Sequence, residues 1–305
     1  MPVPSSPSYR GRFAPSPTGP LHAGSMLAAL GSWLCARQAG GQWLVRIEDI
    51  DPPREVTGAA QGQLQALAAF GLHHDGEIVH QRQRAERYRA ALDGLLARGA
   101  AFECHCSRAD LIATGGIHRR CATTVRRQDP AIRLRVADGA ELAFEDLVRG
   151  RIRQRVDLAA GDFVLRRADG LWAYQLAVVV DDAAQQISHV VRGADLIDST
   201  PRQVLLQQAL GLPTPRYTHL PLLLAEDGKK LSKSDAALPV DVENPLPTLQ
   251  ALWRCLGQQA LPPEDHKSAE AFLAAAACAF RPNRIPAHAQ RATAALHNGR
   301  AARDD

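Results

Sequence analysis

We predict an α/β protein with a doubly wound parallel sheet, because apolar strands alternate with helical segments along the chain. A proline- and glycine-rich loop leads into a helical pattern, and the compact apolar strand 43–47 follows it. The run LAVVVDD at 176–182 is apolar enough to be buried on both faces, as a central parallel strand would be. In such sheets, ligands bind outside the carboxyl ends of the strands.

Length and composition are those of an ordinary globular protein. The 305 residues are 46% hydrophobic and 22% charged, and they include six cysteines. Such a chain can bury a sizeable core, and this balance argues against disorder. No apolar run is long enough to span a membrane, and the Pro/Ser-rich N-terminus lacks the apolar segment of a signal peptide. We therefore expect a cytoplasmic monomer without a membrane partner, whose cysteines do not form a disulfide framework.

Arginines cluster at 82–89, 119–127 and 149–155. Each cluster could contact nucleic-acid phosphates or form ordinary solvated surface. The net charge of +4 is too small to decide between the two.

The loop RFAPSPTGPLHAGS at 12–25 feeds a helix whose apolar residues recur with helical spacing until Gly40. A helix N-terminus presents unpaired backbone N–H groups and the positive end of the helix dipole, and both favour a phosphate. Gly24 would let a nucleotide approach closely, and His22 can donate to phosphate oxygens. Taken alone, however, the loop is more typical of a plain connection between a helix and a strand than of a phosphate site.

Helical patterns also cover 55–70 and 85–98, and each ends at a glycine. Short strands follow from Ile132 onward. The segment 162–182 is predicted to form two strands joined by a turn at Asp169 and Gly170. The second of these strands is the apolar run described above.

A further strand runs into Arg192, and a helix follows it. This helix is predicted to have Thr200 as N-cap, Pro201 at its first position and Gly211 as its stop. The residues after 240 are mainly helical and alanine-rich.

Three cysteines and one histidine supply a metal-binding pattern. Cys104 and Cys106 are separated by one residue, and His118 lies three residues before Cys121. Thiolates and imidazole are the ligands of structural zinc. We predict one structural zinc ion bound by these four residues, with free buried thiols as the alternative. His105 competes for the fourth position, although its side chain should point away from a site formed by its neighbours.

A second motif, KKLSKSD at 229–235, lies more than two hundred residues after the loop. Together, PxPTGxLHxGS and KLSKS resemble the two signature motifs of class I aminoacyl-tRNA synthetases, in the glutamyl form. In that family the first motif holds ATP over the helix end, and the lysines of the second stabilise the pentavalent phosphorus as pyrophosphate leaves. The resemblance implies ATP with Mg²⁺ at His22, Gly24, Ser25 and Lys233, and roles in catalysis for His22, Lys230 and Lys233.

The resemblance also implies a glutamate site, because matching segments of glutamyl-type enzymes contact the substrate carboxylate and amino group. Carried over to this chain, the site comprises Arg12, Phe13, Ala14, Pro15, Ser16, Glu48, Tyr174 and Arg192. From the residues alone, other roles stay open. Tyr174 could be core packing, Arg192 could pair with Asp195 or Asp198, and Glu48 could be an exposed acid.

Ordinary glutamyl-tRNA synthetases resemble roughly the first 240 residues of this chain. They then continue into stem-contact and anticodon-binding regions, for which we expect too little room in the remaining residues. Glutamyl-queuosine tRNA(Asp) synthetases combine the same core and a CxC metal site with such a truncation. Their third zinc-site segment carries a Tyr where His118 would align, and this chain has one residue fewer before Cys121.

This second resemblance implies two reactions. The first is ATP-dependent activation of glutamate to glutamyl-adenylate without tRNA, and the second transfers glutamate to queuosine at the wobble position of tRNA(Asp). The alternatives are a truncated glutamyl-tRNA synthetase that charges the 3′ end of tRNA(Glu), and a non-catalytic paralogue that binds ATP or RNA. We expect a tail (1–9), a Rossmann-type catalytic core in two halves (10–82 and 173–240), an inserted acceptor-domain-like region with the zinc (83–172), and a helical C-terminal region (241–305).

Overall fold

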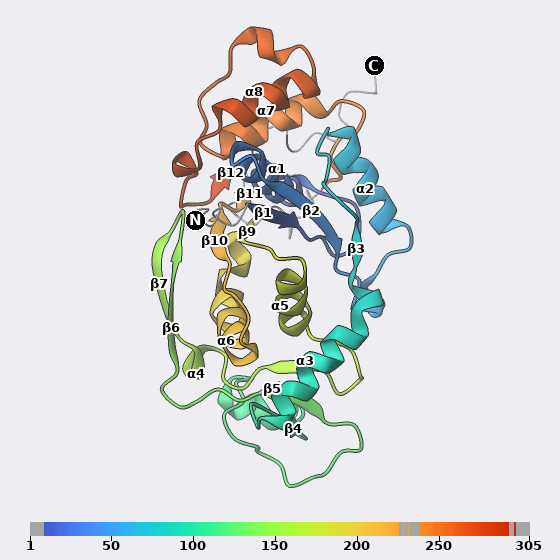
Figure 1. The fold of residues 1–305 in the computed structure, drawn as a ribbon, viewed down its shortest axis with the longest axis vertical. Helices are drawn as coiled ribbons and strands as arrows, with labels where there is room; N and C mark the ends of the chain where they lie inside the picture. The colour runs from blue at the N-terminus through green and yellow to red at the C-terminus, as the bar shows by residue number, and fades with distance from the viewer. Residues whose placement is uncertain (1–8, 226–227, 229–230, 232–237, 293–295, 297–305) are drawn as a thin grey trace, which may run out of the picture.

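The computed structural model describes residues 9–225, 228, 231, 238–292 and 296. Figure 1 shows an elongated molecule in which a sheet around β1 lies between C-terminal helices at one end and a smaller sheet at the other. Among the helices in these residues, none is long and apolar enough to cross a membrane.

A parallel sheet occupies the centre of the molecule. Its strands are β1 (Arg10–Phe13), β2 (Gln42–Ile47), β3 (Val79–His80), β9 (His189–Gly193) and β10 (Arg216–Leu220). β1, β2 and β3 pair in parallel in that order, and β9 pairs in parallel with β10. The backbone N–H of Ser188 donates to the carbonyl of Arg10, which places β9 beside β1. The prediction of a parallel, doubly wound α/β fold is confirmed.

Two further strands extend this sheet beyond β10, and a separate three-stranded sheet is also present. β6 (Glu141–Asp146) joins β10 in parallel, and β7 (Gly150–Arg155) pairs antiparallel with β6 at the outer edge. After α3 (Ala85–Ala97), an antiparallel sheet is formed by β4 (Ala101–Cys104), β5 (Ala131–Leu134) and β8 (Val164–Arg166). This smaller sheet lies at the end of the molecule opposite the C-terminal helices (Figure 1).

The first helix, α1 (Ala23–Gln38), is buried on nearly all sides, because it lies between the central sheet and the helices α7 (Pro245–Cys255) and α8 (Ala269–Ala279). Small residues allow this close packing: a Cβ added at Gly31 would lie 2.6 Å from a methyl carbon of Leu220 on β10. The helix ends as predicted, since Gly40 adopts a φ of +63° just after it.

The segment 174–184 corrects the sequence prediction. We expected a central strand at 176–182, but Tyr174–Ala184 is helix α5. Leu176 to Val179 are buried, as are Asp181 and Asp182, because α5 is packed among its neighbours rather than exposed along one side. A short, continuous apolar run does not reveal whether its period is that of a strand or of an enclosed helix. The preceding strand, β8, was predicted correctly.

Two helix starts also differ from the prediction. α2 (Ala59–Ala69) begins four residues later than expected, after a short 3-10 helix at Pro52–Arg54 and Gly58, whose φ is +79°. α6 (Thr200–Leu210) has Ser199 rather than Thr200 as its N-cap. The hydroxyl of Thr200 instead accepts a hydrogen bond from Arg192 at 2.7 Å, so it serves the cleft described next.

Candidate active site

One cleft brings together every described residue that the sequence assigned to glutamate or ATP. Its volume is about 640 Å³, and it lies at the carboxyl ends of β1, β2 and β9, beside the N-terminus of α1. Arg12 to Ser16, His22, Gly24, Ser25, Glu48, Tyr174 and Arg192 all line it. Lys230 and Lys233 lie outside the described residues, but Leu231 between them lines the same cleft.

His22 caps helix α1. Its Nδ1 accepts hydrogen bonds from the backbone N–H groups of Gly24 at 3.1 Å and Ser25 at 3.3 Å. A Cβ at position 24 would lie 3.0 Å from the imidazole ring, so glycine suits this cap. In the neutral ring, an accepting Nδ1 leaves the hydrogen on Nε2. The imidazole thus occupies amides that we expected from the sequence to be available to a phosphate.

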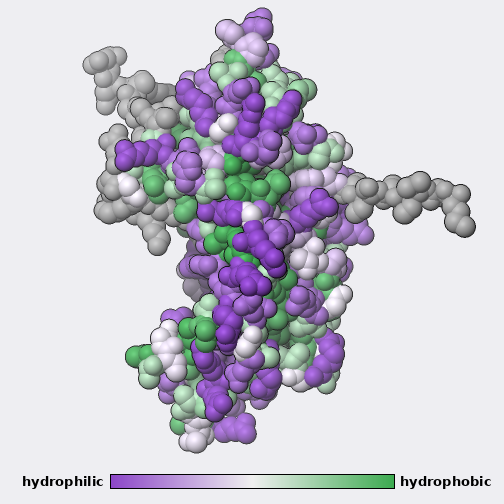
Figure 2. Space-filling model, turned by 90° about the vertical axis from the view of Figure 1, so that its left-hand side faces the viewer, coloured by the Kyte–Doolittle hydropathy of each residue, from purple (hydrophilic) through white to green (hydrophobic). Residues whose placement is uncertain are grey.

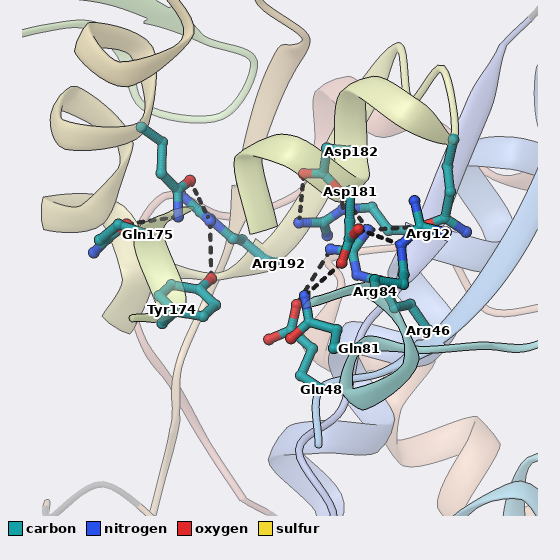
Figure 3. Close-up of polar contacts among 12 residues, drawn as sticks. Arg12, Arg46, Glu48, Gln81, Arg84, Tyr174, Gln175, Asp181, Asp182 and Arg192 are labelled. Atoms are coloured by element: carbon teal, nitrogen blue, oxygen red, sulfur yellow. Dashed lines mark hydrogen bonds and ion pairs between the residues drawn. The ribbon is translucent and has the colours of Figure 1, made fainter. Parts of the chain in front are cut away.

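The floor of the cleft holds a buried ion-pair network, shown in Figure 3. Arg12 on β1 donates through Nε and Nη2 to the two carboxylate oxygens of Asp182 on α5, at 3.1 and 3.3 Å. Arg46 on β2 contacts the same carboxylate at 2.8 Å and also Glu48 at 3.2 Å. Helix α5 therefore fixes the direction of both arginines.

Burial raises the pKa of a carboxylate and the neighbouring arginines lower it, and the balance of these two effects differs between Asp182 and Glu48. Burial by itself would raise the pKa of Asp182, but Arg12 and Arg46 outweigh that effect and hold the pKa below its usual value. For Glu48, burial dominates over the attraction of Arg46 and Arg12, so its pKa is raised. Glu48 is therefore buried beside the cleft rather than being the exposed acid that the sequence left open.

Arg192 is buried on β9, and its guanidinium donates only to uncharged groups among the contacts that the structure defines. Nη1 reaches Gln203 at 2.9 Å and the hydroxyl of Tyr174 at 3.4 Å. Burial raises the pKa of Tyr174, so its hydroxyl keeps a proton that it can donate into the cleft. Because this residue lines the cleft, it is not purely a core residue.

A second cleft of about 1020 Å³ adjoins the first. Ser16, Thr18, Glu48 and Tyr174 line both clefts, so the two share a wall. From there the second cleft extends past Asp51, Arg167 and Trp172 to Cys106 and Leu111. A group bound to the shared wall would be accessible from either side.

Cys104, Cys106, His118 and Cys121 converge as the sequence predicted. Their ligand atoms all lie within 4.8 Å of one another, and the first three residues are buried. His118 Nδ1 contacts Asp162 at 2.8 Å, while its buried Nε2 has no hydrogen-bond partner within the described residues. A carboxylate on one imidazole nitrogen and an unsatisfied second nitrogen facing three thiols fit a metal ion. This cluster could bind a metal such as zinc.

His105 is not part of that cluster. Its Nδ1 accepts from the backbone N–H of Arg127 at 2.9 Å, so the ring is turned toward the loop that carries the arginines. This agrees with the expectation that alternate residues of the CHC segment point in opposite directions.

Strand β7 lies on the left-hand side of Figure 1, which is the side that Figure 2 presents, and hydrophilic side chains gather on this face. Arg151 lies 3.9 Å from Glu145, Arg153 lies 3.6 Å from Glu141, and Arg155 lies 2.8 Å from Asp157. Each positive charge on this strand therefore has a carboxylate nearby. For the cluster at 149–155, solvated surface fits the structure better than a phosphate site.

Five buried ionisable residues behind the cleft were not predicted from the sequence: Arg46, Asp146, Asp181, Asp182 and His219. A usable signal was present, because Arg46 interrupts an apolar strand and the two aspartates end an apolar run. Charged residues are almost never buried unless they are paired. Their partners come from distant segments, which a single sequence does not reveal.

The profile of the family described as tRNA synthetases class I (E and Q), catalytic domain, matches residues 8–128 and 117–245. The glutamyl-Q tRNA(Asp) synthetase of Xanthomonas campestris pv. campestris (strain 8004) is 61% identical, over 92% of this chain and 95% of the relative. The chain belongs to the glutamyl-Q tRNA(Asp) synthetase family. The family member from Shewanella amazonensis is 51% identical, over 91% of this chain and 94% of the relative's own chain.

Solved structures agree with membership in the glutamyl-Q tRNA(Asp) synthetase family. A glutamate tRNA ligase from Elizabethkingia meningosepticum, in complex with its amino acid, is 25% identical with a TM-score of 0.78. The similarity covers 95% of this chain and 68% of that ligase. The chain is thus a ligase of the aminoacyl-tRNA synthetase class, with a class I catalytic fold.

Proposed function

We propose that this chain activates L-glutamate with ATP and Mg²⁺, and then transfers the glutamyl group to queuosine in tRNA(Asp). The observation that carries the proposal is the shared wall, because it joins a cleft holding the residues assigned to glutamate and ATP to a larger one. The family name of the relatives, glutamyl-Q tRNA(Asp) synthetase, supplies the acceptor.

For the first step, glutamate is held between cations and a carboxylate. Asp182 takes the Nε and Nη2 edge of Arg12, so the glutamate side-chain carboxylate would approach Nη1. Glu48 would accept from the substrate amino group, and Tyr174 and Arg192 would complete the binding set. Phe13 to Ser16 form the adjoining wall.

ATP would lie over the N-terminus of α1. Its phosphates compete with Nδ1 of His22 for the amides of Gly24 and Ser25, and the imidazole can turn its donor toward them. The α-carboxylate of glutamate attacks the α-phosphorus in line, and pyrophosphate leaves. Lys230 and Lys233 are assigned to the charge that develops on the phosphate oxygens, and Mg²⁺ bound with ATP would neutralise part of it.

The second step uses the larger cleft. A hydroxyl of the queuosine base attacks the adenylate carbonyl carbon, AMP leaves, and an ester forms. Asp51 and Trp172 line this cleft and offer a hydrogen-bond acceptor and an aromatic face to an unstacked base. Basic residues near the metal cluster, including Arg119 and Arg120, are candidates for contacts with RNA phosphates, which weaken as salt rises.

One measurement tests the activation of glutamate, and a second tests the acceptor. Pyrophosphate exchange should require glutamate but no RNA, and its absence would favour a non-catalytic protein. Next, tRNA charged with labelled glutamate is cut by nuclease, and the labelled fragment is identified. Label on the anticodon fragment of queuosine-containing tRNA(Asp) supports the proposal. Label on the 3′-terminal adenosine of tRNA(Glu) overturns it in favour of a truncated glutamyl-tRNA synthetase.

We further propose that the metal of the Cys104, Cys106, His118 and Cys121 cluster is zinc, with a structural role. All four positions of a tetrahedral ion would be filled by protein, which leaves none for an activated water. Elemental analysis of purified protein should give one zinc per chain, and Cys121→Ser should reduce this value. Cys278→Ser is the matched control, because Cys278 is also exposed but lies outside the cluster. Equal zinc content in both variants would contradict the assignment.

A further inference from the structure

A fully buried, hydrogen-bonded pair of Asp146 and His219 lies directly behind Arg192. His219 is paired with Arg192 across the parallel strands β9 and β10, and its Nδ1 lies 2.7 Å from Oδ2 of Asp146 at the end of β6. Both side chains have a relative exposure of 0%. The hydrogen-bond network continues on the other side of the His219 ring, where Nε2 lies 3.2 Å from Nε of Arg192.

The hydrogen-bond directions follow from the charges. Oδ1 of Asp146 accepts from the backbone N–H groups of Val148 and Arg149, at 3.0 and 2.9 Å. Oδ2 accepts from the backbone N–H of His219 at 3.0 Å and from the ring at 2.7 Å. Nδ1 is therefore the donor. Burial lowers the pKa of His219, which favours the neutral ring, so its Nε2 is free of hydrogen and accepts from Arg192.

The remaining donors of Arg192 are assigned in the same way. Nε donates to His219, while Nη2 donates to Thr200 at 2.7 Å and to the carbonyl of Leu196 at 3.3 Å. Nη1 donates to Gln203 at 2.9 Å and, at the longer distance of 3.4 Å, to Tyr174 on the cleft wall. The contact with Tyr174 is the longest of the five. A carboxylate in the cleft would therefore meet Arg192 at Nη1, without disturbing the edge bound to His219.

We propose that Asp146 and His219 are positioning residues for substrate binding: through Nε, they fix the rotation of the Arg192 guanidinium so that Nη1 faces the glutamate carboxylate. This inference rests on the proposed function, because it assumes that Arg192 binds glutamate. A neutral acceptor at this point also adds no second positive charge beside the guanidinium. Neither residue lines the cleft, so they act on a bound substrate through Arg192, both directly and through Thr200, whose hydroxyl lies 3.1 Å from Nε2 of His219 and accepts from Arg192.

The test measures the KM for glutamate and kcat by pyrophosphate exchange without RNA. His219→Leu should raise the KM about 10-fold or more, with kcat changed less than about 3-fold, since it removes a hydrogen bond to a charged group. His219→Gln keeps an acceptor for Nε and should restore most of the affinity. Tyr217→Phe is the control. Tyr217 lies on the same strand as His219, and its buried hydroxyl accepts a hydrogen bond from Gln207. Removing this hydroxyl should leave the KM unchanged.

A double-mutant cycle with Arg192→Gln separates positioning from general damage. With Arg192→Gln present, His219→Leu should add less than about 2-fold to the KM. If the two losses multiply instead, or if His219→Gln is as impaired as His219→Leu, the proposal is overturned. Should His219→Leu fail to fold in thermal unfolding, Asp146→Asn replaces it in the cycle, and His219→Gln remains the variant expected to keep most of the affinity. A wild-type enzyme without glutamate-dependent exchange would instead refute the proposed function.

Discussion

Replacing Arg46 by methionine is expected to lower the free energy of unfolding by about 3–5 kcal/mol. The Arg46 side chain has an exposure of 0% and pairs with both Asp182 and Glu48. Methionine fills a similar volume but leaves Glu48 without its arginine and Asp182 with Arg12 alone. Breaking a buried pair costs this much because the remaining charge is stranded away from water. Urea-induced unfolding followed by tryptophan fluorescence measures the loss.

Arg37→Met is the matched control for this experiment. Arg37 also pairs with an aspartate, Asp75 at 2.7 Å, but the two side chains are 24% and 34% exposed. Water screens such a pair, so we expect a loss of about 1 kcal/mol or less. Equal losses for the two variants would show that burial of the Arg46 network has no energetic importance.

Lys233→Ala is expected to slow glutamate-dependent pyrophosphate exchange by about 10²- to 10³-fold, which corresponds to roughly 2.7–4 kcal/mol. The KM for glutamate should change little, because the lysine is assigned to charge that is greatest in the transition state. Three of the four lysines of the chain lie at 229–233, although arginine supplies nearly all of the other positive charge. A compact ammonium on a flexible stem suits a phosphate whose charge moves during the reaction.

Lys267→Ala is the control for Lys233→Ala, because Lys267 is the remaining lysine of the chain and is exposed. It should leave both kcat and KM unchanged. If the Lys233→Ala enzyme has a near-normal kcat and weakened glutamate binding, Lys233 acts in substrate binding and not in transition-state stabilisation.

Local signals predicted most of the fold. The α1 helix, strand β2 and helix α3 were found because glycines and apolar periodicity mark them within a few residues of chain. The prediction of a strand at 176–182 was wrong for a physical reason. Helix α5 is enclosed, so its sequence lacks the polar face that would reveal a helical period. The two aspartates that end the run 176–182, Asp181 and Asp182, are unfavourable in a central strand, and they were the sequence signal against that prediction.

The candidate site was predictable where motifs are contiguous. Arg12 to Ser16 and His22 to Ser25 come from one loop, and the four metal-site residues come from 18 consecutive positions, 104 to 121. The supporting network was not predictable, because it depends on which distant segments meet. No local pattern indicates that His219 faces Asp146, or that Arg46 faces Asp182.

Helix α5 also has a consequence for the order in which the chain folds. Asp182 meets partners 170 and 136 residues earlier, Arg12 and Arg46, while Asp181 meets Arg84 and Tyr88, which are 97 and 93 residues earlier. During synthesis, strands β1 and β2 therefore leave the ribosome long before the carboxylates that neutralise their arginines. Contacts of such high sequence separation form late and slowly. We expect β1, β2 and α3 to remain loosely associated until α5 emerges, and its docking to complete the core as one cooperative step.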